Sequence, residues 1–569
     1  MRYLLPSFIS AVILLIFFTT SLPAQQNNTA WSYSIQKKVE CGHGAVVSAH
    51  PLASAAGLAM LQQGGNAFDA AIATQLVLAV VYPGAGNIGG GGFMVAHLTG
   101  GRNIALDFRE RAPAAATRDM YLDAAGNPRT DLSQNGHLAA GVPGTVAGLF
   151  AELKYARLSF SDLVQPAIDL AEHGFVITAA EAEGLNASQA AFVKYNTVLP
   201  VLVKTGKWKA GDTLIQKELA VTLKLIRDKG ARGFYEGRTA ELIIAEMTRG
   251  KGIITAQDLR SYQAIEREPT VFPYKGYSIV TMPLPSSGGV ILQQMMKMVE
   301  DQPLKEYGFE SVKAVHLMTE VERLAYADRA KYLGDRDYYS VPVKTLVSAD
   351  YLRQRMATIT PDKAGNSQEI QAGVLSPKSE ETTHLDVYDR EGNAVSITTT
   401  LNGSYGSKVV VGGAGFLLNN EMDDFSIKPG VPNMYGAVGA EANAIAPGKR
   451  MLSSMTPTLV LDKDHVFVIV GTPGGTTITT SVFQTLIDIL DFGMNAEEAV
   501  NRPKFHHQWL PDVLYVERFF PETIREGLRQ MGYTVTPRGN IGRTEVIEIS
   551  DGKIVAVGDV RGDDSAAGY

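Results

Sequence analysis

Two clusters of threonine stand at the ends of ETTHLDVYDREGNAVSITTT, which covers residues 381–400. Thr382 and Thr383 open the stretch, and three consecutive threonines at 398–400 close it. A threonine hydroxyl is a poor nucleophile unless a base adjoins it. Because threonine is also a common strand residue, the stretch is either an ordinary strand pair or a strand pair that carries a nucleophile.

The segment DREGN at 389–393 has the length and the glycine of a hairpin loop. Pairing outward from this loop places Val387 opposite Val395 and Thr382 opposite Thr400. Because side chains alternate along a strand, this register sorts apolar from polar residues, and a slip of one residue would destroy the sorting. One face then carries Leu385, Val387, Val395 and Ile397, and the other carries Thr382, His384, Asp386, Ser396, Thr398 and Thr400.

A cut in the chain just before Thr382 would supply the missing base. The freed α-amine has a reference pKa of about 7.7–8.0, so it can take the proton of its own hydroxyl. The cut needs no protease, because the hydroxyl can attack the carbonyl of Glu381 and form an ester that water hydrolyses. Residues 361–381, rich in Pro, Gly, Ser and charge, are predicted as an exposed linker that leads to this point.

The composition is that of a globular protein, and the length suggests two or more domains or one large two-layer unit. The chain has 569 residues, of which 45% are hydrophobic and 20% charged. The formal net charge is -7 and no basic run occurs, which argues against nucleic acid as a partner. Helical and strand patterns alternate irregularly, which is typical of helices layered on sheets.

Several elements can be placed by pattern. Residues 53–83 predict two helices, the second capped by Asn66, and residues 144–250 predict a mostly helical region. The stretch PYKGYSIVTMP at 273–283 predicts one strand. The stretch EVIEISDGKIVAVGD at 545–559 predicts a hairpin that closes the chain.

The first residues predict export. Arg2 precedes an apolar run at 8–18 that is short for a membrane span, and small and polar residues follow it. We expect residues 1–24 to be a signal peptide cut after Ala24, with a single membrane anchor as the alternative. The mature protein is then periplasmic or secreted, with no stable membrane span. Cys41 is the single cysteine, so no internal disulfide can form.

A second enzyme class is suggested by GAGNIG at 84–89, which matches the dinucleotide pattern, with Asp107 about 20 residues further on. An exported dehydrogenase would require this pattern to follow a strand and open a helix. Here a helical run and Pro83 precede it and a predicted strand follows it. We therefore expect these glycines to permit close backbone packing.

Many motifs in one order resemble the γ-glutamyltranspeptidases, which are N-terminal nucleophile hydrolases. The resemblance covers essentially everything after the predicted signal peptide. The motifs are DFRERAP at 107, GVPGTVAGL at 141, PLPSSGG at 283, TTHLDV at 382, TLNGSYG at 400, LLNNEMDDFS at 417, PGVPNMYG at 429, KRMLSSMTPT at 449, GTPGG at 471, KFHHQWLPD at 504 and DDSAAGY at the C-terminus.

The resemblance implies an α+β fold, a four-layer αββα sandwich, made as one precursor. It implies a cut between Glu381 and Thr382, giving a large subunit of residues 25–381 and a small subunit of residues 382–569 that stay together. It further implies that Thr382 is the nucleophile and that Thr400 orients it.

For the substrate, the resemblance implies a γ-glutamyl group, whose free end carries an α-carboxylate and an α-ammonium. A guanidinium suits the carboxylate, and Arg109 holds the family's position, assisted by the hydroxyls of Ser453 and Ser454. Without the resemblance, a surface ion pair would be the simpler interpretation of Arg109.

The ammonium requires carboxylate and amide oxygens, and Asp424, Glu421 and Asn402 hold the family's positions. Some members of the family carry Gln where Glu421 stands. Asp423 is adjacent to Asp424, and strand alternation is expected to turn only one of the two inward.

The segment VFVIVGTPGGTTITT at 466–480 predicts a strand, a glycine turn and a helix start. Backbone N–H groups at such a turn can bind an oxyanion, and the resemblance assigns this role to Gly474 and Gly475. No Lys follows the glycines, so the turn is not a phosphate-binding loop of the Walker type. The resemblance also makes residues 429–439 a lid, with Tyr435 as its gate.

The resemblance implies an enzyme that transfers the γ-glutamyl group of glutathione-like donors to water or to amino acids and peptides. No cofactor is expected, and no metal, because His506 and His507 are adjacent and would point in opposite directions on a strand. The alternatives are a cephalosporin or glutaryl acylase, the dehydrogenase, and an inactive binding protein that stays uncut.

Overall fold

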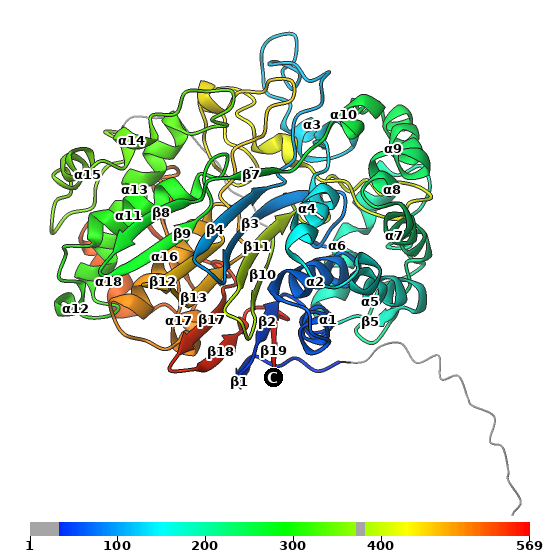
Figure 1. The fold of residues 1–569 in the computed structure, drawn as a ribbon. Helices are drawn as coiled ribbons and strands as arrows, with labels where there is room; N and C mark the ends of the chain where they lie inside the picture. Colours follow the sequence, from blue (N-terminus) through cyan, green and yellow to red (C-terminus); the bar gives the residue numbers. More distant parts are fainter. Residues whose placement is uncertain (1–32, 371–381) are drawn as a thin grey trace, which may run out of the picture.

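The computed structural model describes residues 33–370 and 382–569, in which two seven-stranded sheets stack face to face between two layers of helices (Figure 1). This arrangement confirms the predicted four-layer α+β sandwich. The predicted signal peptide and Glu381 lie outside the described residues. Within the described residues, no helix is both long and apolar enough to cross a membrane.

The first sheet holds the threonine hairpin at its centre. The register is the predicted one, from Tyr388 opposite Ala394 to Thr383 opposite Thr399. The ladder ends there, and Thr382 lies one residue before the first strand. In order across the sheet, the strands are β19 (Ser565–Gly568), β2 (Ala45–Ser48), β10 (Thr383–Tyr388), β11 (Ala394–Thr400), β3 (Gly91–Leu98), β4 (Arg102–Asp107) and β7 (Ile265–Arg267).

The second sheet corrects two predictions. Residues 273–283 are not one strand, because Lys275 and Gly276 both have positive φ and turn the chain back into a hairpin. The hairpin at 545–559 is not the last element, since β19 follows it and crosses into the first sheet. The strands are β1 (Lys38–Cys41), β18 (Lys553–Val557), β17 (Glu545–Ser550), β13 (His465–Gly471), β12 (Thr458–Asp462), β9 (Tyr277–Thr281) and β8 (Thr270–Tyr274).

Helices cover the outer face of each sheet (Figure 1). The predicted helix pair is α1 and α2, and Asn66 caps α2 in a capping box with Asp69. The helical region on the side of the first sheet contains α1 (Pro51–Gln62), α2 (Ala67–Val81), α4 (Thr145–Glu152), α5 (Phe160–His173), α6 (Ala179–Tyr195), α7 (Lys217–Lys229) and α9 (Gly237–Gly250). The helical region on the side of the second sheet contains α11 (Gly288–Val299), α13 (Val312–Tyr332), α16 (Thr477–Leu490), α17 (Ala496–Asn501) and α18 (Glu522–Gln530).

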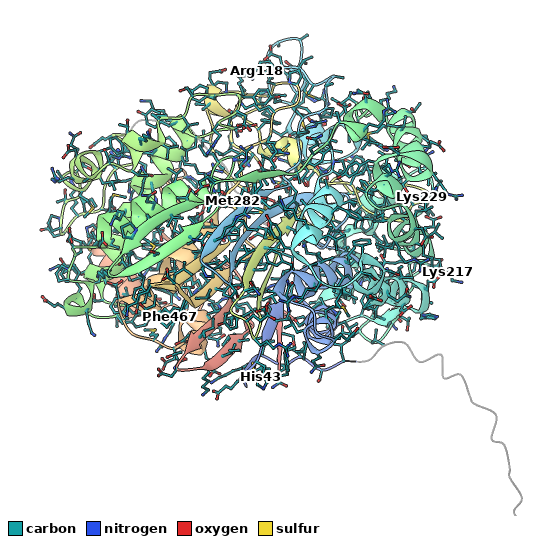
Figure 2. All side chains as sticks on the ribbon, viewed as in Figure 1. His43, Arg118, Lys217, Lys229, Met282 and Phe467 are labelled. Carbon is teal, nitrogen blue, oxygen red and sulfur yellow. The ribbon has the colours of Figure 1, made fainter. Side chains whose placement is uncertain are left out.

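Three apolar cores correspond to the three interfaces between these four layers. The apolar face of the hairpin, including Val387 and Val395, packs against the helices of the first outer layer. Met282 belongs to the core between the sheets and lies near the centre of the molecule, whereas Lys217 and Lys229 lie at its edge (Figure 2). The order of layers therefore follows from which faces of each sheet are apolar.

The polar face of the hairpin is buried against the second sheet. His384 Nδ1 lies 2.9 Å from Thr398 Oγ1, and His384 Nε2 lies 2.9 Å from Asp386 Oδ1. Gly471 on β13 faces this histidine, since a Cβ there would fall 2.1 Å from its ring. These side chains satisfy much of their hydrogen bonding within the hairpin, which permits a polar surface between two sheets.

The glycines at 84–89 lie in a turn between α2 and β3, so the dinucleotide interpretation fails on element order. A Cβ on Gly89 would fall 2.1 Å from the carbonyl oxygen of Leu417, which confirms that close backbone packing requires glycine here. Asp107 instead forms ion pairs with Arg267 at 2.7 Å and Arg450 at 2.8 Å.

Only part of the predicted linker, residues 361–370, is described, and most of these residues are exposed. Ser367 is the exception to the predicted exposure. It is buried because its N–H donates to Asp512 (2.8 Å) and its carbonyl accepts from Trp509 Nε1 (3.2 Å). Hydrogen bonds of the Ser367 backbone therefore anchor this half of the predicted linker to the loop at 507–513.

Glu152 provides a test of the helical layer on the first sheet. Its side chain on α4 is fully buried, and Gln75 Nε2 on α2 donates to both oxygens at 3.1 and 2.9 Å. Burial raises the pKa of Glu152 from 4.5 to about 8.

Replacing Glu152 by Gln should flatten the pH dependence of the free energy of unfolding between about pH 4.5 and pH 8. The folded protein retains a proton that the unfolded chain releases, so wild-type stability falls as pH rises through this window, by up to about 1.4 kcal/mol per pH unit. Denaturant unfolding across the window measures the slope. The exposed Glu241→Gln on α9 is the control, and equal slopes for wild type and E152Q would contradict the assignment.

Candidate active site

Thr382 is buried at the junction of two cavities. The smaller one, called here the polar pocket, contains every predicted site residue except Gly474. Gly474 lines the larger cavity together with Thr382. The polar pocket is lined by Arg109, Arg329, Thr382, Thr400, Asn402, Glu421, Asp424, Asn433, Tyr435, Ser453, Ser454 and Gly475, among others.

Thr400, the last residue of β11, lines this pocket, and the turn that follows fixes its hydroxyl. The backbone N–H of Asn402 donates to Thr400 Oγ1 at 2.7 Å, and Asn402 has a φ of 75°, a left-handed conformation that asparagine tolerates. Its side-chain amide donates to the carbonyl of Asn420 at 3.0 Å. One short turn thus orients the Thr400 hydroxyl and ties it to the segment that carries Glu421 and Asp424.

Arg109 follows β4 and lies at the bottom of the pocket, with only 1% of its surface exposed. Its guanidinium forms ion pairs with Glu421 at 2.6 Å and Asp424 at 2.5 Å. The carboxylates around it raise its pKa against the effect of burial. Arg109, which is predicted to bind the donor carboxylate, therefore contacts Glu421 and Asp424, which are predicted to bind the donor ammonium.

Burial also changes the acids around Arg109. It raises the pKa of Glu110 to about 8. Burial, together with the nearby Glu110 and Asp424, raises the pKa of Glu421 well above its usual range in spite of the ion pair with Arg109. The charges of Glu110 and Glu421 therefore depend on Arg109, which lies beside both of them.

Asp423 and Asp424 do diverge, but not by strand alternation. They lie in a 3-10 turn, η3 (Glu421–Asp424), where only Asp424 reaches Arg109. Asp423 is buried elsewhere, contacts Ser133 and accepts the backbone N–H of Met434 at 2.7 Å. Burial raises its pKa to about 7. Asp423 thus anchors the segment that begins at residue 429.

That segment, residues 429–439, borders the polar pocket through Asn433 and Tyr435. The Tyr435 hydroxyl donates to the carbonyl of Asn402 at 2.5 Å, and Asn433 Nδ2 donates to Asp424 Oδ1 at 2.9 Å. The segment is therefore hydrogen-bonded to two residues that line the pocket, Asn402 and Asp424.

The glycine turn has the predicted strand–turn–helix context, because β13 ends at Gly471 and α16 begins at Thr477. Gly474 and Gly475 have φ of 137° and 51°, values that favour glycine. Gly475 lines the polar pocket and Gly474 the larger cavity, so the two glycines flank Thr382. The start of α16 adds a partial positive charge at this place.

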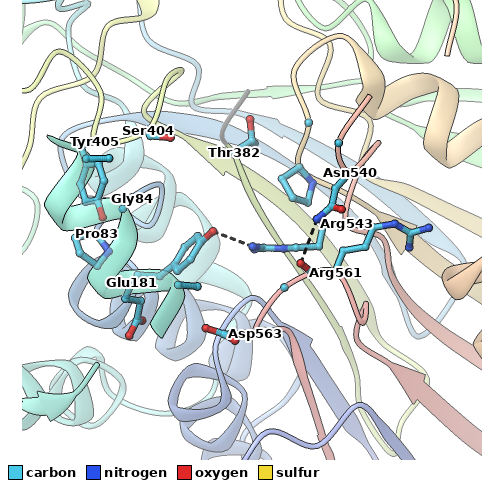
Figure 3. A pocket seen from close by; sticks show the side chains of 18 of the residues that line it. Pro83, Gly84, Glu181, Thr382, Ser404, Tyr405, Asn540, Arg543, Arg561 and Asp563 are labelled. Carbon is cyan, nitrogen blue, oxygen red and sulfur yellow. Dashed lines mark hydrogen bonds between the residues drawn. The ribbon is translucent and has the colours of Figure 1, made fainter. Parts of the chain in front are cut away.

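The larger cavity has a volume of about 810 Å³ and was not predicted from the sequence. In Figure 3, Thr382 lies at one end, α6 with Glu181 forms one wall, and Arg543 extends from the opposite wall. Arg543 donates to the Tyr82 hydroxyl at 2.9 Å across the cavity. The lining comes from segments hundreds of residues apart, which no local pattern could bring together.

Arg329 and Asn433 also line the polar pocket and were missed. Arg329 lies on α13, where nearly every residue is buried, so the helical period does not single it out. Asn433 lies within the predicted lid but carries no motif of its own. Their positions emerge only from tertiary contacts, of Arg329 with Ser454 and of Asn433 with Asp424.

His506 and His507 have separate hydrogen-bond partners. His506 contacts Thr480 Oγ1 at 2.8 Å, and His507 contacts Asp512 at 3.3 Å. Burial lowers their pKa values to about 3 and about 4, so both are neutral. Within the described ranges, no group of three or more His, Cys, Asp or Glu side chains is arranged to hold a metal ion.

Known proteins are similar to this chain over most of its length. Residues 53–569 match the family described as gamma-glutamyltranspeptidase. The chain is 44% identical to the glutathione hydrolase proenzyme of Escherichia coli strain K12 over 549 residues, which is 95% of this chain and 94% of that protein.

Solved structures are also similar to this chain, and two of them illustrate the similarity. The cephalosporin acylase of Bacillus halodurans superposes with a TM-score of 0.81 at 26% identity, over 98% of this chain and 99% of that one. The γ-glutamyltranspeptidase of Helicobacter pylori superposes with a TM-score of 0.56 at 45% identity, over 60% of this chain and 97% of that one. The chain belongs to the γ-glutamyltranspeptidase family.

Proposed function

We propose that this protein cleaves the γ-glutamyl amide bond of glutathione and related compounds through a γ-glutamyl-enzyme, and transfers the group to water or to amino acids and peptides. The observation that carries the proposal is the position of Thr382. It lies in one pocket with two guanidinium groups, two carboxylates, two serine hydroxyls and a glycine turn. These are the groups that the zwitterionic end and the scissile carbonyl of a γ-glutamyl donor require.

The chemistry begins once Thr382 is a chain terminus. Its α-amine takes the hydroxyl proton as the oxygen attacks the γ-carbonyl carbon, and the N–H groups of Gly474 and Gly475 stabilise the oxyanion. Collapse breaks the C–N bond, and the ammonium returns the proton to the leaving amine. Water or an acceptor amine then attacks the ester, with the same amine as base, and releases the Thr382 hydroxyl.

Donor binding exchanges ion pairs that already exist. The α-carboxylate of the donor takes the place of Asp424 on Arg109, and the freed carboxylates of Asp424 and Glu421 receive its ammonium. Asn402 completes the ammonium site, and the hydroxyls of Ser453 and Ser454 contact the donor carboxylate. Since Asn433 and Tyr435 are hydrogen-bonded to this set, the lid moves when the exchange occurs.

The larger cavity serves the other side of the scissile bond. Thr382 is common to both cavities, so the leaving peptide departs, and an acceptor enters, from the side of Gly474 and α6. Its volume of about 810 Å³ is in the range of ligand sites that hold a small peptide.

The protein is made as an exported precursor. Residues 1–24 are removed as a signal peptide, and the hydroxyl of Thr382 cuts the chain after Glu381 into subunits of residues 25–381 and 382–569. The subunits stay together because β10 and β11 of the small one pair with β2 and β3 of the large one. Separating them would expose the centre of the first sheet.

The acylase alternative is favoured by the close superposition on a cephalosporin acylase. A glutaryl group lacks the α-ammonium, however, and so has no use for the paired carboxylates of Glu421 and Asp424. The higher sequence identity to a glutathione hydrolase also favours the γ-glutamyl donor.

On a denaturing gel, the purified wild-type protein should give two fragments whose boundary is Glu381–Thr382, and Thr382→Ala should remain one chain. Thr382→Ser, which retains a hydroxyl, should be cut as well. N-terminal sequencing of the smaller fragment should begin at Thr382. A wild-type chain that stays intact would overturn the mechanism.

Replacing Asp424 by Asn should raise KM for a chromogenic L-γ-glutamyl anilide by about 10- to 100-fold, because a charged hydrogen bond to the ammonium is lost. The glutaryl anilide, which has no ammonium, should show no such change. The exposed Asp119→Asn serves as the control. Equal wild-type rates on both anilides would point to the acylase instead.

A further inference from the structure

Arg329 is a buried cation that the proposed mechanism does not use. It projects from α13 into the polar pocket with 8% of its surface exposed. Its Nε donates to Ser287 Oγ at 3.0 Å, and its Nη2 donates to Ser454 Oγ at 3.1 Å. Both partners are neutral hydroxyls.

The charge of Arg329 is not matched as that of Arg109 is. Within residues 33–370 and 382–569, Arg109 has ion pairs with Glu421 and Asp424, whereas no carboxylate oxygen lies within 4.0 Å of Arg329. Burial lowers the pKa of Arg329, with Tyr326 and Asp424 acting in the opposite direction. A buried guanidinium without a paired carboxylate is costly, so its presence at the wall of a binding pocket points to an anion that enters.

The hydrogen bond to Ser454 has a direction. Arginine can only donate, so Ser454 Oγ is an acceptor in this contact, and its own proton stays available for another partner. The Ser453 hydroxyl is also an acceptor, because its Oγ accepts a hydrogen bond from the backbone N–H of Met455 at 3.1 Å. Both hydroxyls of the pair are therefore held ready to donate to an anion in the pocket.

We infer that Arg329 is a positioning residue for the α-carboxylate of the donor, orienting the Ser454 hydroxyl toward it and adding a second positive charge behind it. The inference rests on the proposed γ-glutamyl function and deepens it. Arg109 binds the carboxylate directly, whereas Arg329 acts through a hydroxyl. Donors that carry an α-carboxylate are thereby preferred over those that lack one.

Two anilides separate this role from a merely structural one. The L-γ-glutamyl anilide carries the α-carboxylate, and the 4-aminobutyryl anilide retains the ammonium but lacks the carboxylate. Arg329→Met should raise KM for the first by about 10- to 100-fold with kcat changed less than about threefold, and should leave KM for the second within about twofold. Arg329→Lys, which retains a cationic donor, should recover part of the loss.

The matched control is Arg323→Lys, a buried arginine on the same helix that pairs with Glu320 and Asp512 and does not line the pocket. It should lower thermal stability without shifting KM for either anilide. An equal KM increase on both anilides in R329M, or none on either, would overturn the inference.

Arg329→Met is tested for folding and cutting by thermal unfolding and a denaturing gel. If it fails either, R329K, S454A and the double variant carry the test, since two changes that act through one hydroxyl should combine to less than the product of their KM effects. Multiplicative effects would contradict the inference.

A second measurement needs no turnover. L-glutamate should raise the thermal midpoint of the wild type more than 4-aminobutyrate does, and this difference should shrink in R329K. If the difference between the two thermal shifts is the same in R329K as in the wild type, the inference about Arg329 is wrong and the proposed function is not affected. A wild type that does not cleave the γ-glutamyl anilide fails the proposed function, which is a distinct result.

Discussion

The structure depends on the register of one antiparallel pair, β10 with β11, which is buried on both faces. The apolar face packs under α2, and the polar face, with His384 bonded to Asp386 and Thr398, packs against the second sheet. Because a slip of one residue would turn the polar side chains toward the helices and the apolar ones toward the second sheet, only one register is stable. Thr382 and Thr400 consequently meet at the same end of the pair, in one pocket.

The register places the two threonines in the polar pocket, and the charged groups of the pocket determine which ligand it binds. Arg109 with Glu421 and Asp424 forms a buried ion-pair cluster, and breaking such a cluster without replacement is strongly unfavourable. The carboxylate of a zwitterion can replace the acidic partner of Arg109, and its ammonium can replace the cationic partner of Glu421 and Asp424. A simple anion or a simple cation can make only one of these two replacements. Arg329 and the two serines bias the same pocket toward the carboxylate end. The pocket thus selects by the number and sign of charges as much as by shape.

Much of this could be predicted from the sequence, because the signals were local. The hairpin, the capped helix pair at Asn66 and the glycine turn before α16 each depend on a few neighbouring residues, and each was confirmed. The prediction of one strand at 273–283 was wrong because a two-residue turn at Lys275–Gly276 divides the stretch between β8 and β9. The family resemblance supplied the site residues that local pattern could not, and the pocket does assemble them.

From its own patterns the sequence determined the register of the hairpin, the capped helix pair and helices layered on sheets, since these follow from alternation and capping; the four layers and the list of polar groups at the site came from the resemblance of its motifs to one family. Only the tertiary structure decided that Asp424 and not Asp423 reaches Arg109, because a 3-10 turn replaces the expected strand. It likewise decided that Arg329 enters the pocket and that a large cavity adjoins Thr382. These facts depend on contacts between segments hundreds of residues apart, and no local periodicity encodes such contacts.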